Sequence, residues 1–253
     1  MKTFFSEYVS NYETYSFGYW YYALPKSIEE YSQAYESWFL TYTANLTFQD
    51  SVFFMCRSLR VNTTVFENNS ENRRILRKVK PYEITAHWHD INDFNTVDEE
   101  FIDFCLLYAS SRFSHASMSK ERLAYILSRQ YINRILEFRM NDKPIGYVVC
   151  AQTDRSLHYY FCFFDISMME QIPLGKYFMW YAIDQAKQKS IPYVYLGTWY
   201  KSTALYKVRD FNWIEWWDGN QRQTDVERLK QLCMSDEEQK SQDQFKEHPD
   251  LYL

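Results

Sequence analysis

One stretch, from Leu174 to Phe211, constrains the fold of this 253-residue chain more than any other. It opens with an expected glycine turn at Gly175, followed by a helix that Pro192 stops. The residues that share one face of this helix are Phe178, Tyr181, Ala182, Gln185 and Ala186. The aromatic and branched run 193–196 predicts a buried strand. Gly197 ends that strand at a bend or a close backbone approach, and a second helix follows and packs back on the sheet. Ligands of α/β proteins tend to bind at such corners.

The composition excludes two nucleotide-binding motifs. Only five glycines are spread along the chain, whereas a P-loop or a Rossmann fingerprint needs clustered glycines. The net charge is −5 and the pI is near 5.6, so we expect no large cationic face for nonspecific nucleic-acid binding. A local basic patch is compatible with these values.

The chain carries the composition of a protein from a reducing compartment. Its five cysteines are odd in number and unclustered, which favours the cytoplasm. The N-terminal residues lack the apolar core of a signal peptide, and no apolar run is long enough to span a bilayer. We therefore expect a cytoplasmic monomer with no membrane contact.

Hydrophobic periodicity predicts further elements on both sides of the central stretch. Helices are expected at 27–39, 98–108, 119–130 and 225–234, and strands at 135–140, 145–151 and 156–165. The aromatic run 15–23 predicts a strand or a buried loop, and 70–78 either opens a helix or follows a turn. The run 81–96 is expected to connect two halves, and 235–253 to form a loosely held polar tail.

Two local clusters have alternative interpretations. The basic region 56–80 is either a solvated charged face or a phosphate contact, since arginine forks suit phosphate and carboxylate alike. His87 and His89 would lie on one face of a strand, but a metal site needs further ligands and none stand out. We expect no metal and no cofactor.

Several motifs together resemble one enzyme family. They are Asn72-Arg73-Arg74-Ile75-Leu76-Arg77, Glu137-Phe138-Arg139 with its hairpin, Tyr160-Phe161-Cys162-Phe163-Phe164-Asp165, and the block from Leu174 to Lys207 with its Leu-Gly-x-Tyr, Tyr-Val-Tyr-Leu-Gly and Tyr-Lys elements. In this order they resemble the aminoacyl-tRNA–protein transferases, that is, arginyl-tRNA–protein transferase and its bacterial leucyl-transferring relatives. The family usually carries paired cysteines near the N-terminus, whereas this chain has only Cys56 in that half.

The resemblance implies an α+β fold with a GNAT-like (acetyltransferase-type) mixed β-sheet flanked by helices. It divides the chain into an aromatic-rich N-terminal subdomain (1–90), a GNAT-like domain (91–222) and a polar tail (223–253). It implies transfer of Arg or Leu from aminoacyl-tRNA to the N-terminal amine of an acceptor protein, of the N-degron type. The aromatic residues of 1–55 then either fill a core or stack on the tRNA acceptor end.

The resemblance also implies roles for individual residues. Asp165 would bind the cationic group of the donor amino acid, or it is a helix cap. The backbone around Tyr195 to Gly197 would hold the scissile carbonyl, and Gly175 would belong to the substrate-binding residues. Tyr206 and Lys207 would contact the tRNA end or orient the amine. The remaining candidates, which would pair with phosphate or with an acidic N-terminal side chain, are Arg74 and Arg77.

The chemistry expected of such a site is modest, because the donor ester is already activated. The acceptor amine has a pKa of roughly 7.7–8.0, so a useful fraction is neutral near neutral pH. Two alternatives remain at this point. One is an acyl-CoA-dependent N-acyltransferase on the same fold, with pyrophosphate held at a helix N-terminus. The other is a non-catalytic module that binds protein N-termini.

Overall fold

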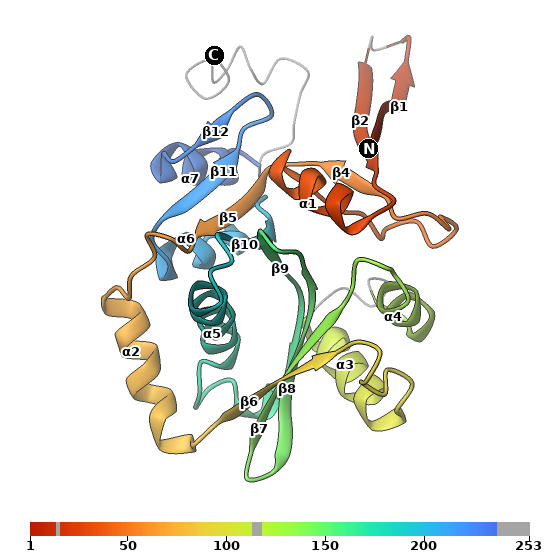
Figure 1. Cartoon of the computed structure of the whole chain (residues 1–253). Coiled ribbons are helices and arrows are strands. Elements are labelled where there is room, and N and C mark those ends of the chain that lie inside the picture. Colours follow the sequence, from red (N-terminus) through yellow and green to blue (C-terminus); the bar gives the residue numbers. More distant parts are fainter. Residues whose placement is uncertain (14–15, 113–117, 237–253) are drawn as a thin grey trace.

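The computed structural model describes residues 1–13, 16–112 and 118–236, which form two β-sheets and a set of helices, most of which lie around the larger sheet (Figure 1). The smaller sheet is antiparallel and has the strand order β1-β2-β4-β3. Its strands are β1 (Lys2–Asn11), β2 (Ser16–Leu24), β4 (Phe53–Met55) and β3 (Phe39–Thr41). In Figure 1 its β1–β2 hairpin extends away from the rest of the molecule.

The larger sheet has the order β12-β11-β5-β10-β9-β8-β7-β6. Its strands are β5 (Ser58–Asn62), β6 (Thr85–Asp90), β7 (Arg134–Met140), β8 (Lys143–Gln152), β9 (Ser156–Phe164), β10 (Tyr193–Thr198), β11 (Ile214–Trp217) and β12 (Arg222–Gln223). Neighbouring strands are antiparallel except for β9 and β10, which are parallel. This mixed sheet confirms the predicted fold class, although the meander has four strands because β6 lies in the expected connector.

The helices of the described residues are α1 (Ile28–Glu36), α2 (Ser70–Val79), α3 (Glu99–Arg112), α4 (Lys120–Leu127), α5 (Leu174–Gln188), α6 (Tyr206–Asp210) and α7 (Val226–Ser235). Short 3-10 turns occur at η1 (Lys80–Tyr82), η2 (Ile166–Met168) and η3 (Ser202–Ala204). Side chains of Ser27 and Ser119 cap α1 and α4 by accepting from a backbone N–H in the first turn. The predicted starts of these two helices are thereby confirmed.

Helix α5 makes the crossover between the parallel strands β9 and β10 and packs on one face of the larger sheet (Figure 1). Phe178 of α5 stacks on Phe138 of β7, with ring centroids 3.7 Å apart. This close approach requires the missing side chain of Gly146, since a Cβ there would lie 2.1 Å from Phe178 Cε2. The second core, on the other face, includes Tyr35, Tyr195 and Phe163.

Replacing Gly146 with Ala is expected to lower the free energy of unfolding by about 2 kcal/mol, because the added methyl group overpacks the ring stack. Urea denaturation of the two proteins measures the difference. Val97→Ala is the matched control, because Val97 is 77% exposed and a change there is expected to stay within about 0.5 kcal/mol. A Gly146→Ala protein as stable as the Val97→Ala protein contradicts the expectation.

The expected glycine turn at Gly175 is wrong. Gly175 lies inside the first turn of α5, which begins at Leu174. A Cβ at Gly175 would come within 2.9 Å of Phe164 Cε1, so the glycine serves a close approach between α5 and β9 and not a change of chain direction.

The predicted subdomain boundary at residue 90 stays a prediction. Strands β5 and β6 precede that boundary and pair within the larger sheet. Most of the predicted polar tail, residues 237–253, lies outside the described residues. Within the described part of the chain, no helix has the length and apolar character needed to cross a bilayer.

Candidate functional site

The candidate site lies where the parallel strands β9 and β10 separate. Their pairing covers three residue pairs and ends at Tyr195 opposite His158. Beyond this point β10 bends at Gly197, whose φ is +86°. Strand β9 carries one extra residue, Tyr160, relative to β8, and a bulge of this kind bends a strand. The two strand ends therefore diverge, and a pocket lies on each side of the opening.

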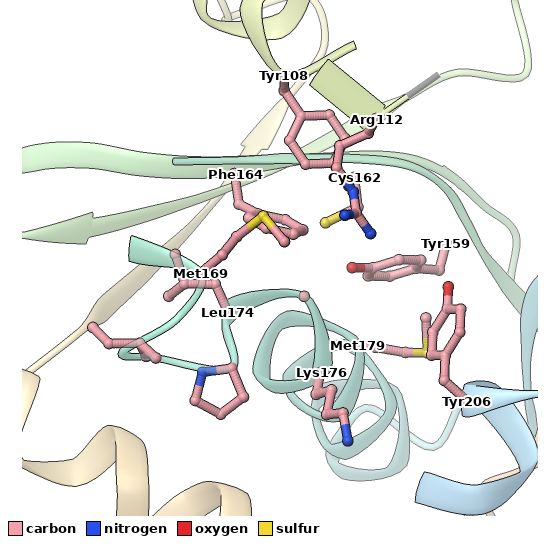
Figure 2. Close-up of a pocket in the computed structure, with 13 residues that line it drawn as sticks. Tyr108, Arg112, Tyr159, Cys162, Phe164, Met169, Leu174, Lys176, Met179 and Tyr206 are labelled. Carbon is pink, nitrogen blue, oxygen red and sulfur yellow. The ribbon is translucent and has the colours of Figure 1, made fainter. Parts of the chain in front are cut away.

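Pocket 1 is a cavity of about 350 Å³ between the end of β9, the N-terminus of α5 and the start of α6 (Figure 2). Its lining residues are Tyr108, Arg112, Tyr159, Cys162, Phe164, Met169, Ile172, Pro173, Leu174, Gly175, Lys176, Met179 and Tyr206. Most of these side chains are apolar, and none is a carboxylate. Two of the predicted site residues, Gly175 and Tyr206, are thus brought together here.

Two phenol groups are the polar centre of pocket 1. Figure 2 shows the hydroxyls of Tyr159 and Tyr206 pointing into the cavity. Tyr159 is 6% exposed, and the Cys162 thiol lies beside its hydroxyl. Burial raises the pKa of Tyr206 to about 12 and that of Tyr159 further above its ordinary value. Both groups therefore stay protonated near neutral pH and present hydrogen-bond donors to the cavity.

Cationic side chains stand at the edge of pocket 1. Arg112 lies beside Tyr108 and opposes the rise in the pKa of that phenol, which burial causes. The Lys176 ammonium is 3.1 Å from Glu71 and 3.0 Å from the buried Asp210. In the first turn of α5, the N–H groups of Leu174 and Tyr177 donate to the carbonyls of Ile172 and Pro173, and no side-chain hydrogen bond caps the helix start. The positive end of the α5 dipole favours negative charge at this edge, whereas Lys176 is already paired with two carboxylates.

Pocket 2 is a cavity of about 390 Å³ on the other side of β9. It is lined by Trp20, Leu40, Thr41, Tyr42, Thr43, Ala44, Phe54, Arg122, His158, Tyr160, Phe161, Leu196, Gly197, Thr198 and Lys207. The smaller sheet, the residues that directly follow β3, and β9 supply most of its wall. Gly197 and Lys207 are the predicted site residues that line it, and again no carboxylate is present.

Lys207 holds the bent end of β10. Its ammonium donates to the carbonyl oxygens of Leu196 (2.5 Å) and Thr198 (3.3 Å). A Cβ on Gly197 would lie 3.7 Å from Lys207 Nζ, so the lysine packs directly against the bend of the strand. Burial lowers the pKa of Lys207 to about 8.

Sequence reasoning missed His158, which also lines pocket 2. The imidazole is 1% exposed, and its Nδ1 lies 3.2 Å from the Tyr35 hydroxyl. Its Nε2 has no hydrogen-bond partner among the described residues. Burial, together with the nearby Lys207 charge, lowers the pKa of His158 to about 3, so the ring is neutral. No local pattern could reveal it, because its neighbours come from distant parts of the chain.

Four predicted site residues lie outside both pockets. The Asp165 carboxylate accepts from the backbone N–H (2.9 Å) and the hydroxyl (2.6 Å) of Ser167 at the start of η2. Tyr195 is fully buried, and its hydroxyl donates to the Tyr35 carbonyl and accepts from Arg60. Their proposed roles in binding the donor stay predictions.

The two candidate arginines lie on α2. Arg74 forms an ion pair with Glu71, which is 2.5 Å away, and this hydrogen bond lowers the pKa of Glu71 to about 2. Arg77 borders a shallow apolar hollow on α2 together with Arg73. Their predicted contact with phosphate or an acidic side chain stays a prediction.

The histidine pair of β6 is not part of a metal cluster in the described structure. His89 Nε2 lies 2.9 Å from Glu137. Among the described residues, no group of three or more His, Cys, Asp or Glu side chains is placed to hold a metal ion.

Comparison with known proteins identifies a related family. Residues 96–209 match the family model described as arginine-tRNA-protein transferase, C terminus. A protein named aspartate/glutamate leucyltransferase from Thiobacillus denitrificans is 30% identical over 148 residues, which cover 57% of this chain and 59% of the relative. One of the same name from Teredinibacter turnerae is 26% identical over 153 residues, covering 58% and 60%. The chain thus spans about 60% of the length of these relatives.

Similarity to solved structures is weak. The structure of L-PGS from Bacillus licheniformis aligns with a TM-score of 0.40 and 10% identity, over 70% of this chain and 54% of that one. A likeness of this size does not bear on function.

Proposed function

We propose that this chain, whose residues 96–209 belong to the aminoacyl-tRNA–protein transferase family, transfers an amino acid from aminoacyl-tRNA to the N-terminal amine of an acceptor protein. The amine nitrogen attacks the ester carbonyl carbon, and a new amide bond forms. The bond from that carbon to the ribose oxygen breaks, and the proton lost by the amine ends on the ribose hydroxyl. The chain would also act in labelling proteins for degradation, as the N-degron interpretation implies.

The observation that carries this proposal is the pair of pockets at the opening between β9 and β10. The consecutive residues Tyr206 and Lys207 line pocket 1 and pocket 2 respectively. A transfer between two substrates needs one binding site for each, with the reacting atoms in between. Holding an amine against an activated ester can lower the activation barrier by on the order of 7–11 kcal/mol, so such a site needs little further chemistry.

Pocket 1 suits the donor. The helix start and Arg112 would attract the phosphates of the tRNA end. The protonated hydroxyls of Tyr159 and Tyr206 would hydrogen-bond the ribose or the ester carbonyl, whose oxygen gains negative charge during attack. An oxyanion needs donors that are already in place, and both phenols point into the cavity.

The lining of pocket 1 favours an apolar donor such as leucine over arginine. Met169, Ile172, Leu174 and Met179 form much of its wall, and neither Asp nor Glu is among the lining residues. A guanidinium group buried without a carboxylate partner is strongly disfavoured, whereas a leucine side chain gains free energy by burial there. The relatives that match this chain are themselves named leucyltransferases.

Incubation of the protein with individual charged tRNAs and a panel of peptides that differ at residue one tests the proposal. Mass spectrometry is expected to show leucine added to an acceptor peptide from leucyl-tRNA, and at least about 10-fold less arginine from arginyl-tRNA. Addition of no amino acid from any tRNA would exclude transfer. Thermal stabilisation by acetyl-CoA, with none by aminoacyl-tRNA, would favour the acyl-CoA alternative instead.

Replacing Tyr206 with Phe is expected to lower the transfer rate about 10- to 100-fold, because one donor to the developing oxyanion is lost. Tyr206 is 39% exposed, so the fold should tolerate the change. Tyr19→Phe, at a 59% exposed position of β2, is the control and should transfer at the wild-type rate. Equal rates for both variants would remove the Tyr206 hydroxyl from the reaction.

A further inference from the structure

In pocket 2, the buried Nε2 of His158 lacks a hydrogen-bond partner among the described residues. Buried polar side chains nearly always have a hydrogen-bond partner. The His158 ring is 1% exposed, yet its Nε2 has no partner among the described residues. The ring belongs to the lining of a 390 Å³ cavity, so a ligand in that cavity can supply the missing partner.

The His158 ring is held in a fixed orientation. Its Nδ1 lies 3.2 Å from the hydroxyl of the fully buried Tyr35. The Tyr35 and Tyr160 rings pack against it at centroid distances of 5.6 and 4.9 Å. In the tautomer in which Nδ1 donates to the Tyr35 hydroxyl, Nε2 is an acceptor, and in that tautomer pocket 2 presents a rigid acceptor for an N–H group.

The charges around pocket 2 select the uncharged form of an amine. Arg122 and Lys207 line the pocket, and no carboxylate does. The ionisable groups that face His158 are Tyr35 from α1, Tyr160 from β9 and Lys207 from α6, and none of them would stabilise an ammonium ion. Cationic neighbours favour the neutral amine, which is also the form that has a lone pair for attack and an N–H to donate.

We infer that pocket 2 binds the N-terminal amine of the acceptor in its neutral form and that His158 Nε2 accepts a hydrogen bond from it. This inference rests on the proposed transfer function. It gives His158 a substrate contact that neither the family match nor the sequence motifs assign. The acceptor chain would leave the pocket along Trp20 and Phe54, which stack at 5.7 Å in its wall.

Binding of a peptide that begins with Asp, compared with its N-acetylated twin, tests the amine site without any tRNA. In fluorescence anisotropy, wild-type protein is expected to prefer the free amine by about 10-fold, which is the worth of one hydrogen bond to a buried group. His158→Ala should lose this preference. His158→Gln should retain it, because the Gln amide reaches the position of Nε2. His158→Asn should lose it, because its amide reaches only the position of Nδ1.

The same variants separate this role from a structural one. If His158 acts only by holding Tyr35 through Nδ1, then Asn would rescue binding and Gln would not, and the inference is overturned. In transfer assays, His158→Ala and His158→Asn should raise the KM for the peptide about 10-fold and leave the KM for aminoacyl-tRNA unchanged. An unchanged preference for the free amine in His158→Ala would also overturn the inference.

A measurement on wild-type protein covers the case of a variant that does not fold. In protein labelled with isotopic nitrogen in histidine, the Nε2 resonance of His158 should shift when the free-amine peptide binds and stay in place with the acetylated peptide. Equal shifts with both peptides contradict the inference. Failure of wild-type protein to transfer any amino acid, with amine-dependent binding intact, would instead contradict the proposed function.

Discussion

Acidification from about pH 7 to about pH 4 is expected to remove about 3 kcal/mol of the free energy of unfolding through His158 alone, since one pKa unit corresponds to 1.36 kcal/mol. The pKa of His158 is about 3 in the folded protein, because the ring is buried near Lys207. In the unfolded chain a histidine has a pKa near 6.5. Between these two values the unfolded state binds a proton that the folded state does not, so stability falls as the pH falls.

Urea denaturation of wild-type protein and His158→Gln at a series of pH values isolates this contribution. Carboxylates titrate in both proteins, so the difference between the two curves belongs to residue 158. The wild-type protein should lose stability more steeply than His158→Gln between about pH 6.5 and pH 3. His87→Gln, which removes an exposed histidine of β6, should follow the wild-type curve. Parallel curves for wild type and His158→Gln would show that the folded state protonates His158 readily.

Replacing Arg60 with Met is expected to destabilise the protein by about 3 kcal/mol, because it leaves a buried carboxylate without its main partner. Arg60 Nε is 2.8 Å from Glu215, and Nη1 is 2.9 Å from the Tyr195 hydroxyl. The guanidinium lies between the rings of Trp38 and Tyr193, at 4.0 and 3.7 Å. Arg60 and Glu215 are each 5% exposed. Arg222 still reaches Glu215 at 3.0 Å, which places the loss at the lower end of the usual range.

A double variant and a surface variant complete the Arg60 experiment. Arg60→Met combined with Glu215→Leu should recover most of the stability, because no uncompensated charge remains. Arg134→Met breaks an ion pair with Asp90 whose side chains are 37% and 36% exposed, and it should cost at most about 1 kcal/mol. If Arg60→Met costs no more than Arg134→Met, the buried network does not stabilise the fold as argued.

Local signals were enough to predict helices α1, α3, α4, α5 and α7 and strands β7 to β10, whereas β1, β3, β4, β5, β11 and β12 were not predicted. Ser27 and Ser119 are caps with a side-chain oxygen, and Pro192 follows α5, so the helix limits are encoded within a few positions. The error at Gly175 arose because a glycine can serve either a turn or a close approach. Only the ring of Phe164, distant in sequence, decides between them.

Local sequence signals also predicted part of the candidate site. Gly175, Gly197, Tyr206 and Lys207 line the two pockets because they belong to the segment that forms the corners after β9 and β10. His158 was missed because its role depends on contacts with Tyr35, which is 123 residues away in the chain. Pairing over such distances leaves no periodic trace in the sequence.

The short helix α6 contributes to both pockets, and this limits how their linings can change. Its first two residues serve different pockets, Tyr206 on one side of the sheet and Lys207 on the other. An insertion or deletion of one residue before α6 would exchange or displace both side chains at once. Evolution and engineering alike are thus confined here to substitutions in place, because a shift of this segment that alters one pocket also disturbs the other.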